Sequence, residues 1–178
     1  RDDEILARYQ HEFTPNFNTE VSFRHRRIYG NDAVPLKRAD GTFDNSFSVN
    51  QLHWSGRFSW EERVNRGFFE KAFLFTRYPV ITVDLAAGLK GITPGDCQFF
   101  RGELTVDWKV PTTAIGFGRL HVNGGAILGS VPYPLLKLHE GNQSLLFGNP
   151  VISLLDKSAF SMMNYYEFAS DRWVTAFY

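Results

Sequence analysis

A strict alternation of apolar and polar residues constrains the fold of this chain more than any other feature. The clearest stretch sets one series of positions against another: Phe100, Leu104, Val106, Trp108 and Val110 against Arg101, Glu103, Thr105, Asp107 and Lys109. Successive side chains of a β-strand point to opposite faces of a sheet, so this segment has one apolar and one polar face. The same period recurs at 51–60, 81–89 and 119–128. The sequence therefore predicts an all-β chain.

The alternating segments are long for strands. A tilted strand needs about 9–11 residues to cross a bilayer, whereas strands of soluble sheets average about 5–6. Weaker strand patterns occur at 18–28, 68–75 and 166–178, which brings the expected total to about seven or eight. We expect an antiparallel transmembrane β-barrel, in which residues 1–178 form part of one barrel domain within a larger barrel.

The connections between these segments differ in length. By strand parity, we expect 61–67, 90–97 and the long loop 130–165 at one end of the strands, and the turns 76–79 and 111–113 at the other. Long loops on one side and short turns on the other are typical of outer-membrane barrels. This parity predicts that loop 130–165 is extracellular.

Alternation alone does not say whether the apolar face contacts lipid outside the barrel or packs inside it, because a soluble lipocalin-like barrel has the same period with its apolar face inward. Mixed charges on the polar positions favour a polar lumen, and aromatics near strand ends favour an interfacial girdle. The expected lumen residues are Asp84, Arg101, Glu103, Asp107, Arg119 and His121. The expected girdle residues are Trp60, Tyr78, Phe99, Phe100 and Trp108.

Composition excludes several classes of partner and structure. The chain has 19 basic and 19 acidic side chains, and this balance gives no field that would favour nucleic acid. No apolar run approaches the ~18 residues of a membrane helix. Cys97 is the single cysteine, which excludes an intrachain disulfide and a cysteine metal cluster. We expect no cofactor, no metal, no catalytic residue and no nucleic-acid partner.

Two sequence blocks carry a family resemblance. Residues 129–142, GSVPYPLLKLHEGN, and 163–172, MNYYEFASDR, resemble blocks of a Bacteroidota outer-membrane family that joins an N-terminal carboxypeptidase-regulatory-like domain to a barrel domain of unknown function. Pieces at 24–26 and 76–80 are similar to its earlier strands, so the resemblance covers most of the chain from about residue 18; nothing here resembles the regulatory-like domain. The resemblance implies an outer-membrane location and further strands after this segment. It carries over no catalytic residues.

The long loop holds the most distinctive sequence. Candidates for a loop or partner contact are Pro132, Tyr133, Pro134, Leu135, Leu136, His139 and Asn142. Two interpretations of these residues are equally favoured. In the first, the loop plugs the barrel mouth or contacts a partner; in the second, it folds around a small apolar core of its own. His139 and Glu140 could ligate a metal, but without a second spaced histidine a structural role is favoured.

The basic run at 24–27 has two interpretations. On a strand its members alternate between faces, which favours lumen ion pairs for two of them and rim positions for the others. The alternative is a contact to lipid phosphate.

Three functions remain open. The first is a non-enzymatic outer-membrane barrel for transport, outer-membrane assembly or scaffolding of a surface complex. Its partners would be outer-membrane lipid and lipopolysaccharide, with other outer-membrane or surface lipoprotein subunits as further candidates. The second is a soluble lipocalin-like ligand-binding barrel. The third is an outer-membrane barrel hydrolase, disfavoured because no Gly-x-Ser-x-Gly elbow and no nucleophile–base pair is recognisable in the sequence.

Overall fold

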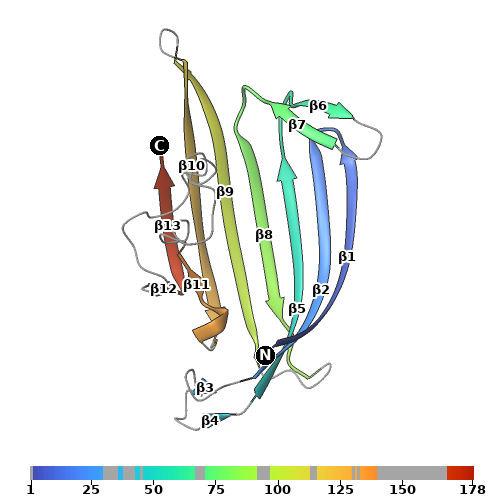
Figure 1. Ribbon diagram of the computed structural model, residues 1–178, viewed down its shortest axis with the longest axis vertical. Helices are drawn as coiled ribbons and strands as arrows, with labels where there is room; N and C mark the ends of the chain where they lie inside the picture. The colour runs from blue at the N-terminus through green and yellow to red at the C-terminus, as the bar shows by residue number, and fades with distance from the viewer. Residues whose placement is uncertain are drawn as a thin grey trace.

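A single curved antiparallel sheet dominates the fold (Figure 1). The computed structural model describes residues 2–29, 36–37, 43–44, 46–66, 71–91, 97–112, 116–129, 131, 133–139 and 168–178. The seven strands of the main sheet, in their spatial order, are β1 (Asp2–Thr14), β2 (Phe17–Tyr29), β5 (Ser46–Phe58), β8 (Val80–Gly88), β9 (Phe99–Thr112), β10 (Gly116–Gly129) and β13 (Arg172–Phe177). The prediction of an all-β antiparallel fold is confirmed.

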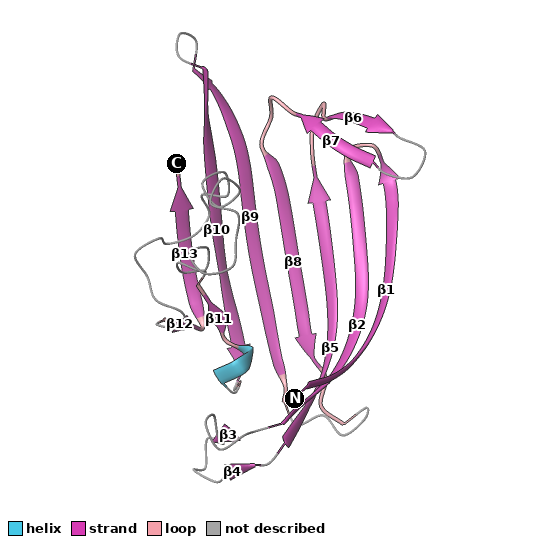
Figure 2. Cartoon of the chain, in the orientation of Figure 1, coloured by secondary structure: helices cyan, strands magenta, loops and turns pink. Residues whose placement is uncertain are grey.

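Short elements lie beside the sheet. They are the pairs β3 (Leu36–Lys37) with β4 (Phe43–Asp44), β6 (Arg63–Arg66) with β7 (Lys71–Phe75) and β11 (Lys137–Leu138) with β12 (Ala169–Ser170), and the 3-10 turn η1 (Tyr133–Leu135). Figure 2 shows η1 at the lower end of β10.

The main sheet is an open meander. Each long strand pairs with the next long strand along the chain, and β9 pairs with β10 over its whole length, from Phe99↔Gly129 to Thr112↔Gly116. The outer strands are β1 and β13. Within the described residues the sheet therefore does not close into a barrel.

The placement of the β5–β8 connection corrects the sequence prediction. Segment 68–75 was expected to cross the sheet, but β7 pairs with β6 in a separate hairpin beyond the ends of β5 and β8. The described residues 61–66 lie at the opposite end of the sheet from 90–91, 97 and 133–139 (Figure 1). The prediction that 61–67 shares an end with 90–97 and 130–165 is therefore wrong, because one fewer strand crosses between them. The turn 76–79 lies at the end where β9 passes to β10, as predicted (Figure 1).

The ladder register extends the alternation of single strands across the sheet. Glu103 is paired with Asp84 on β8 and Gly125 on β10. Val106, on the other face, is paired with Ile81 and Val122. Since directly paired residues share a face, strands β8, β9 and β10 have one polar and one apolar face, and these names are used below for the two faces of the whole sheet.

One end of the polar face carries the small apolar core. Its buried members are Ile28, Phe47, Val49, Cys97, Phe99, Ile127 and Trp173, with Val131 and Leu135 packed against them. Phe99 is 6% exposed, so its expected place in an outer girdle is wrong: it pairs with Gly88 and Gly129 on the polar face. The other four expected girdle residues are exposed.

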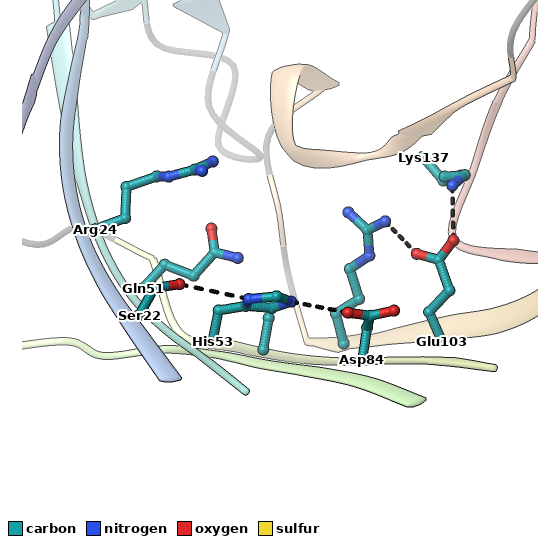
Figure 3. A pocket seen from close by; sticks show the side chains of 9 residues that line it. Ser22, Arg24, Gln51, His53, Asp84, Glu103 and Lys137 are labelled. Carbon is teal, nitrogen blue, oxygen red and sulfur yellow. Dashed lines mark hydrogen bonds and ion pairs between the residues drawn. The ribbon is translucent and has the colours of Figure 1, made fainter. Parts of the chain in front are cut away.

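Glycines opposite aromatic rings let this core approach the sheet. A Cβ at Gly88 would overlap the Phe99 ring, and one at Gly125 would overlap the Trp173 ring. Aromatic rings that cover strand glycines are a known device of curved sheets. Both pairs lie on the polar face, and the strands curve around this face (Figure 3).

Candidate functional site

All six residues predicted to line a lumen lie on the polar face, in three ion-paired groups. Glu103 on β9 is the centre of the largest group. Its carboxylate accepts a hydrogen bond from Lys137 Nζ at 2.8 Å and from Asn123 Nδ2 at 2.8 Å, and it pairs with Arg101. Charge-assisted hydrogen bonds of this kind are stronger than neutral ones.

The Glu103 group continues into the apolar core. Asn123 accepts a hydrogen bond from Trp173 Nε1 at 2.7 Å and donates to Thr105 Oγ1 at 2.8 Å. The Arg101 guanidinium and the Lys137 ammonium lie 5.4 Å and 5.5 Å from the centre of the Trp173 ring, within range of cation–π attraction. The group therefore ties β9, β10 and β13 to the segment that holds β11.

The second group lies towards the opposite end of β9 and β10. Asp107 Oδ1 is 2.8 Å from His121 Nδ1 and 3.3 Å from Arg119 Nη2. The side chains of Asp107 and Arg119 are more exposed than that of Glu103, so water screens this group more strongly.

A pocket of about 310 Å³ lies between the polar face and β11. It is lined by Ser22, Arg24, Gln51, His53, Asp84, Ala86, Arg101, Glu103 and Lys137. Figure 3 shows Lys137 reaching Glu103 from the side opposite the sheet. The pocket joins four strands that are neighbours in the sheet and one segment that follows them in sequence.

The pocket contains an arrangement that no sequence motif marks. His53 lies between Ser22 and Asp84: its Nδ1 is 3.5 Å from Ser22 Oγ and its Nε2 is 3.3 Å from Asp84 Oδ1. A nucleophile, a base and an orienting carboxylate in line are the elements of hydrolytic triads. The three residues come from β2, β5 and β8, and cross-strand register, invisible in one sequence, brings them together.

Other features of the arrangement are poor for catalysis. Ser22 is 6% exposed, and the Ser22–His53 distance is at the outer limit of a hydrogen bond. The backbone amides beside these residues belong to the paired strands β2, β5 and β8. Amides in a ladder lie in the plane of the sheet and do not point into the pocket as an oxyanion hole requires.

The described part of the long loop folds onto the polar face. Leu135 packs against the apolar core, Lys137 pairs with Glu103, and His139 Nε2 is 3.1 Å from Ser170 Oγ. Tyr133 is exposed, Leu136 is partly buried and donates its backbone N–H to Tyr133 O at 3.1 Å, and Pro134 lies within η1. Pro132 and Asn142 lie outside the described residues. A partner contact by these residues stays a prediction.

The basic run divides between the faces as its alternation predicts. Arg24 and Arg26 lie on the polar face and His25 and Arg27 on the other. Arg24 Nε is 3.2 Å from Glu4 Oε1, and His25 Nδ1 is 2.7 Å from Asn50 Oδ1. The ion pair of Arg24 agrees with the structural interpretation of this run.

The apolar face carries most of the exposed large hydrophobic side chains. They are Ile5, Tyr9, Phe13, Val21, Leu52, Phe100, Leu104, Trp108, Leu128, Val174 and Tyr178. Leu104, in the middle of the sheet, is 49% exposed. Large exposed apolar patches are rare on soluble monomers and mark contacts with proteins or membranes.

Comparison with known proteins gives no match: no family model, no curated protein and no solved structure resembles the chain significantly. The resemblance to the Bacteroidota outer-membrane family therefore stays a prediction. No helix in the described part of the chain is both long and apolar enough to span a membrane. Nor do its described residues include three or more His, Cys, Asp or Glu side chains placed to hold a metal ion.

Proposed function

We propose that this sheet is part of the wall of a non-enzymatic outer-membrane β-barrel that serves transport, outer-membrane assembly or scaffolding of a surface complex. One observation carries the proposal: the face with exposed apolar side chains lies opposite a face of ion-paired polar side chains, around which the strands curve. Lipid would cover the apolar face, and water would fill the lumen on the polar side.

The direction of curvature weighs against the soluble alternative. A lipocalin-like barrel closes around its apolar face to make a ligand cavity and shows its polar face to water. Here the enclosed side holds Arg24, Asp84 and Glu103, while Leu104 and Val174 lie on the outside. A soluble barrel would need its apolar face turned inward, whereas here a buried apolar core covers only one end of the enclosed side.

The open edges bear on how such a barrel would be completed. Unpaired backbone groups in hydrocarbon cost several kcal/mol each. We therefore propose that further strands, from the same polypeptide or a partner, pair with β1 and β13 in the membrane. That residues 1–178 belong to one such domain, and that its surroundings are lipid and lipopolysaccharide of a bacterial outer membrane, follow from the same proposal and from the family resemblance.

Membrane extraction tests the proposal. The full chain should remain in carbonate-washed membranes, float with lipid vesicles and migrate differently on gels before and after boiling, as folded barrels do. A chain that folds in buffer without detergent and stays with the aqueous fraction would contradict the proposal.

A hydrolase is the second candidate, favoured by the Ser22–His53–Asp84 line. It predicts hydrolysis of a short-chain 4-nitrophenyl ester that Ser22→Ala abolishes and Ser55→Ala, a neighbouring serine of the polar face, leaves unchanged. Equal rates for the two variants would remove this candidate.

A further inference from the structure

We propose that the pocket between the polar face and β11 binds the acidic group, a carboxylate or a phosphate, of a small solute. The inference rests on the proposed function, because it names the class of solute that the water-filled lumen would bind at this pocket. A volume of about 310 Å³ lies at the lower end of the range for small-molecule sites.

The first support is the balance of charge around the pocket. Three cationic side chains, Arg24, Arg101 and Lys137, face two carboxylates, Asp84 and Glu103. Arg101 and Lys137 share the single carboxylate of Glu103, so this side of the pocket has one net positive charge, whereas Arg24 is paired with Glu4. A cleft with an excess of one sign attracts solutes of the other.

The second support is which partner of each ion pair is accessible. The Glu103 side chain is 10% exposed, whereas Arg101 and Lys137, which both pair with it, are 30% and 27% exposed. The Glu103 carboxylate is therefore less accessible to a solute than the two cations that pair with it. Asp84 is the more accessible carboxylate of the lining, and His53 already contacts it at 3.3 Å.

The third support is the set of donors left over. Arg24 uses Nε for Glu4, and Figure 3 shows its terminal guanidinium nitrogens pointing into the pocket. The Gln51 amide, also aimed there, has no hydrogen-bond partner among the described residues. Lys137 donates to Glu103, and its ammonium group has further N–H donors. Such donors match the oxygens of a carboxylate or phosphate.

Calorimetric titration of the full chain in detergent micelles tests the inference. The probes are inorganic phosphate, succinate and glucose at low ionic strength. We expect saturable binding of phosphate or succinate and none of glucose, and the two anions separate the two acidic chemistries. Binding of glucose as tight as that of the anions, or saturable binding of none of the probes, would overturn the inference.

Two variants and one control locate the binding. Arg24→Gln should weaken binding at least tenfold, and Gln51→Glu should abolish it by placing a negative charge among the donors. Arg119→Gln removes a cation of the polar face outside the pocket and should change the affinity less than twofold. If Arg119→Gln weakens binding as much as Arg24→Gln, the attraction is diffuse and the pocket is not a site.

The outcomes separate this inference from the proposed function. A chain that inserts into vesicles but binds neither anion keeps the barrel and loses the site. A chain that binds through Arg24 but never associates with lipid keeps the site and loses the barrel.

Discussion

The two faces of strand β9 differ in what holds their side chains in place. On the polar face, Glu103 and Asp107 each have named partners at hydrogen-bond distance. On the other face, Val106 is paired with Ile81 and Val122, which are also apolar. The side chains of the polar face are held by specific hydrogen bonds and ion pairs, whereas the stability of the apolar face depends on whether water or lipid surrounds it. Substitutions should therefore fail for different reasons on the two faces.

The largest effect is expected from a charge placed on the apolar face. Val106 lies in the middle of β9, so Val106→Arg should lower the free energy of unfolding in vesicles by about 2–4 kcal/mol. Urea titrations followed by tryptophan fluorescence would measure it. Thr82→Arg, on the polar face of the neighbouring strand, is the control and should cost less than about 1 kcal/mol, because its charge would enter water. Equal costs would break the distinction between the faces.

The next effect concerns the best-partnered group. Glu103→Ala removes the acceptor of Lys137, Asn123 and Arg101 and should cost about 1.5–3 kcal/mol, the range for hydrogen bonds to charged groups. Asp107→Ala breaks the more exposed group and should cost at most about 1 kcal/mol. The same urea titration compares the two, and a larger cost for Asp107→Ala would contradict the assignment of Glu103 as the centre.

A third prediction probes curvature. Gly88→Ala on the polar face would place a Cβ against the Phe99 ring and should cost about 1–3 kcal/mol through overpacking. Gly102→Ala on the apolar face would meet Leu85 Cδ2 at 3.7 Å, an ordinary contact, and should change stability by less than about 0.5 kcal/mol. If the two variants are equally stable, the close approach of ring and strand does not shape the sheet.

The smallest effect concerns the tether from the long loop. Lys137→Met removes one partly exposed ion pair and should cost less than about 1 kcal/mol, yet it should speed proteolysis near residues 133–139. Lys90→Met, at an exposed position of the β8–β9 connection, should leave the cleavage rate unchanged. Identical digestion of both variants and the parent chain would show that Lys137 does not hold the segment.

Local periodicity predicted most of the strands, because each needs no information beyond its own residues, but it gave no prediction for β1 (Asp2–Thr14) at one edge of the sheet. The alternation from Phe100 to Val110 identified both the strand and its faces. The same reasoning failed at 68–75. This segment has the pattern of a strand and contains β7, but β7 pairs with β6 outside the main sheet and not with a strand of that sheet. Which strand pairs with which depends on chain geometry, and period alone does not contain it.

The candidate site was only half predictable for a similar reason. Asp84, Arg101 and Glu103 stand out because charges recur on one face of an otherwise apolar strand. Gln51 and Ser22 do not stand out, since a lone polar residue on a strand is common. Their relevance depends on cross-strand neighbours and on Lys137, which reaches the pocket from a different part of the chain.

In the proposed barrel the apolar face meets lipid and the polar face meets water. A nitroxide scan from residue 104 to 109, in a Cys97→Ser background and with the full chain in lipid vesicles, distinguishes the two environments residue by residue. Labels at 104, 106 and 108 should collide mainly with oxygen, which concentrates in lipid, and labels at 105, 107 and 109 with a water-soluble nickel chelate. Nickel accessibility at 104, 106 and 108, or the same accessibility at all six positions, would contradict the claim.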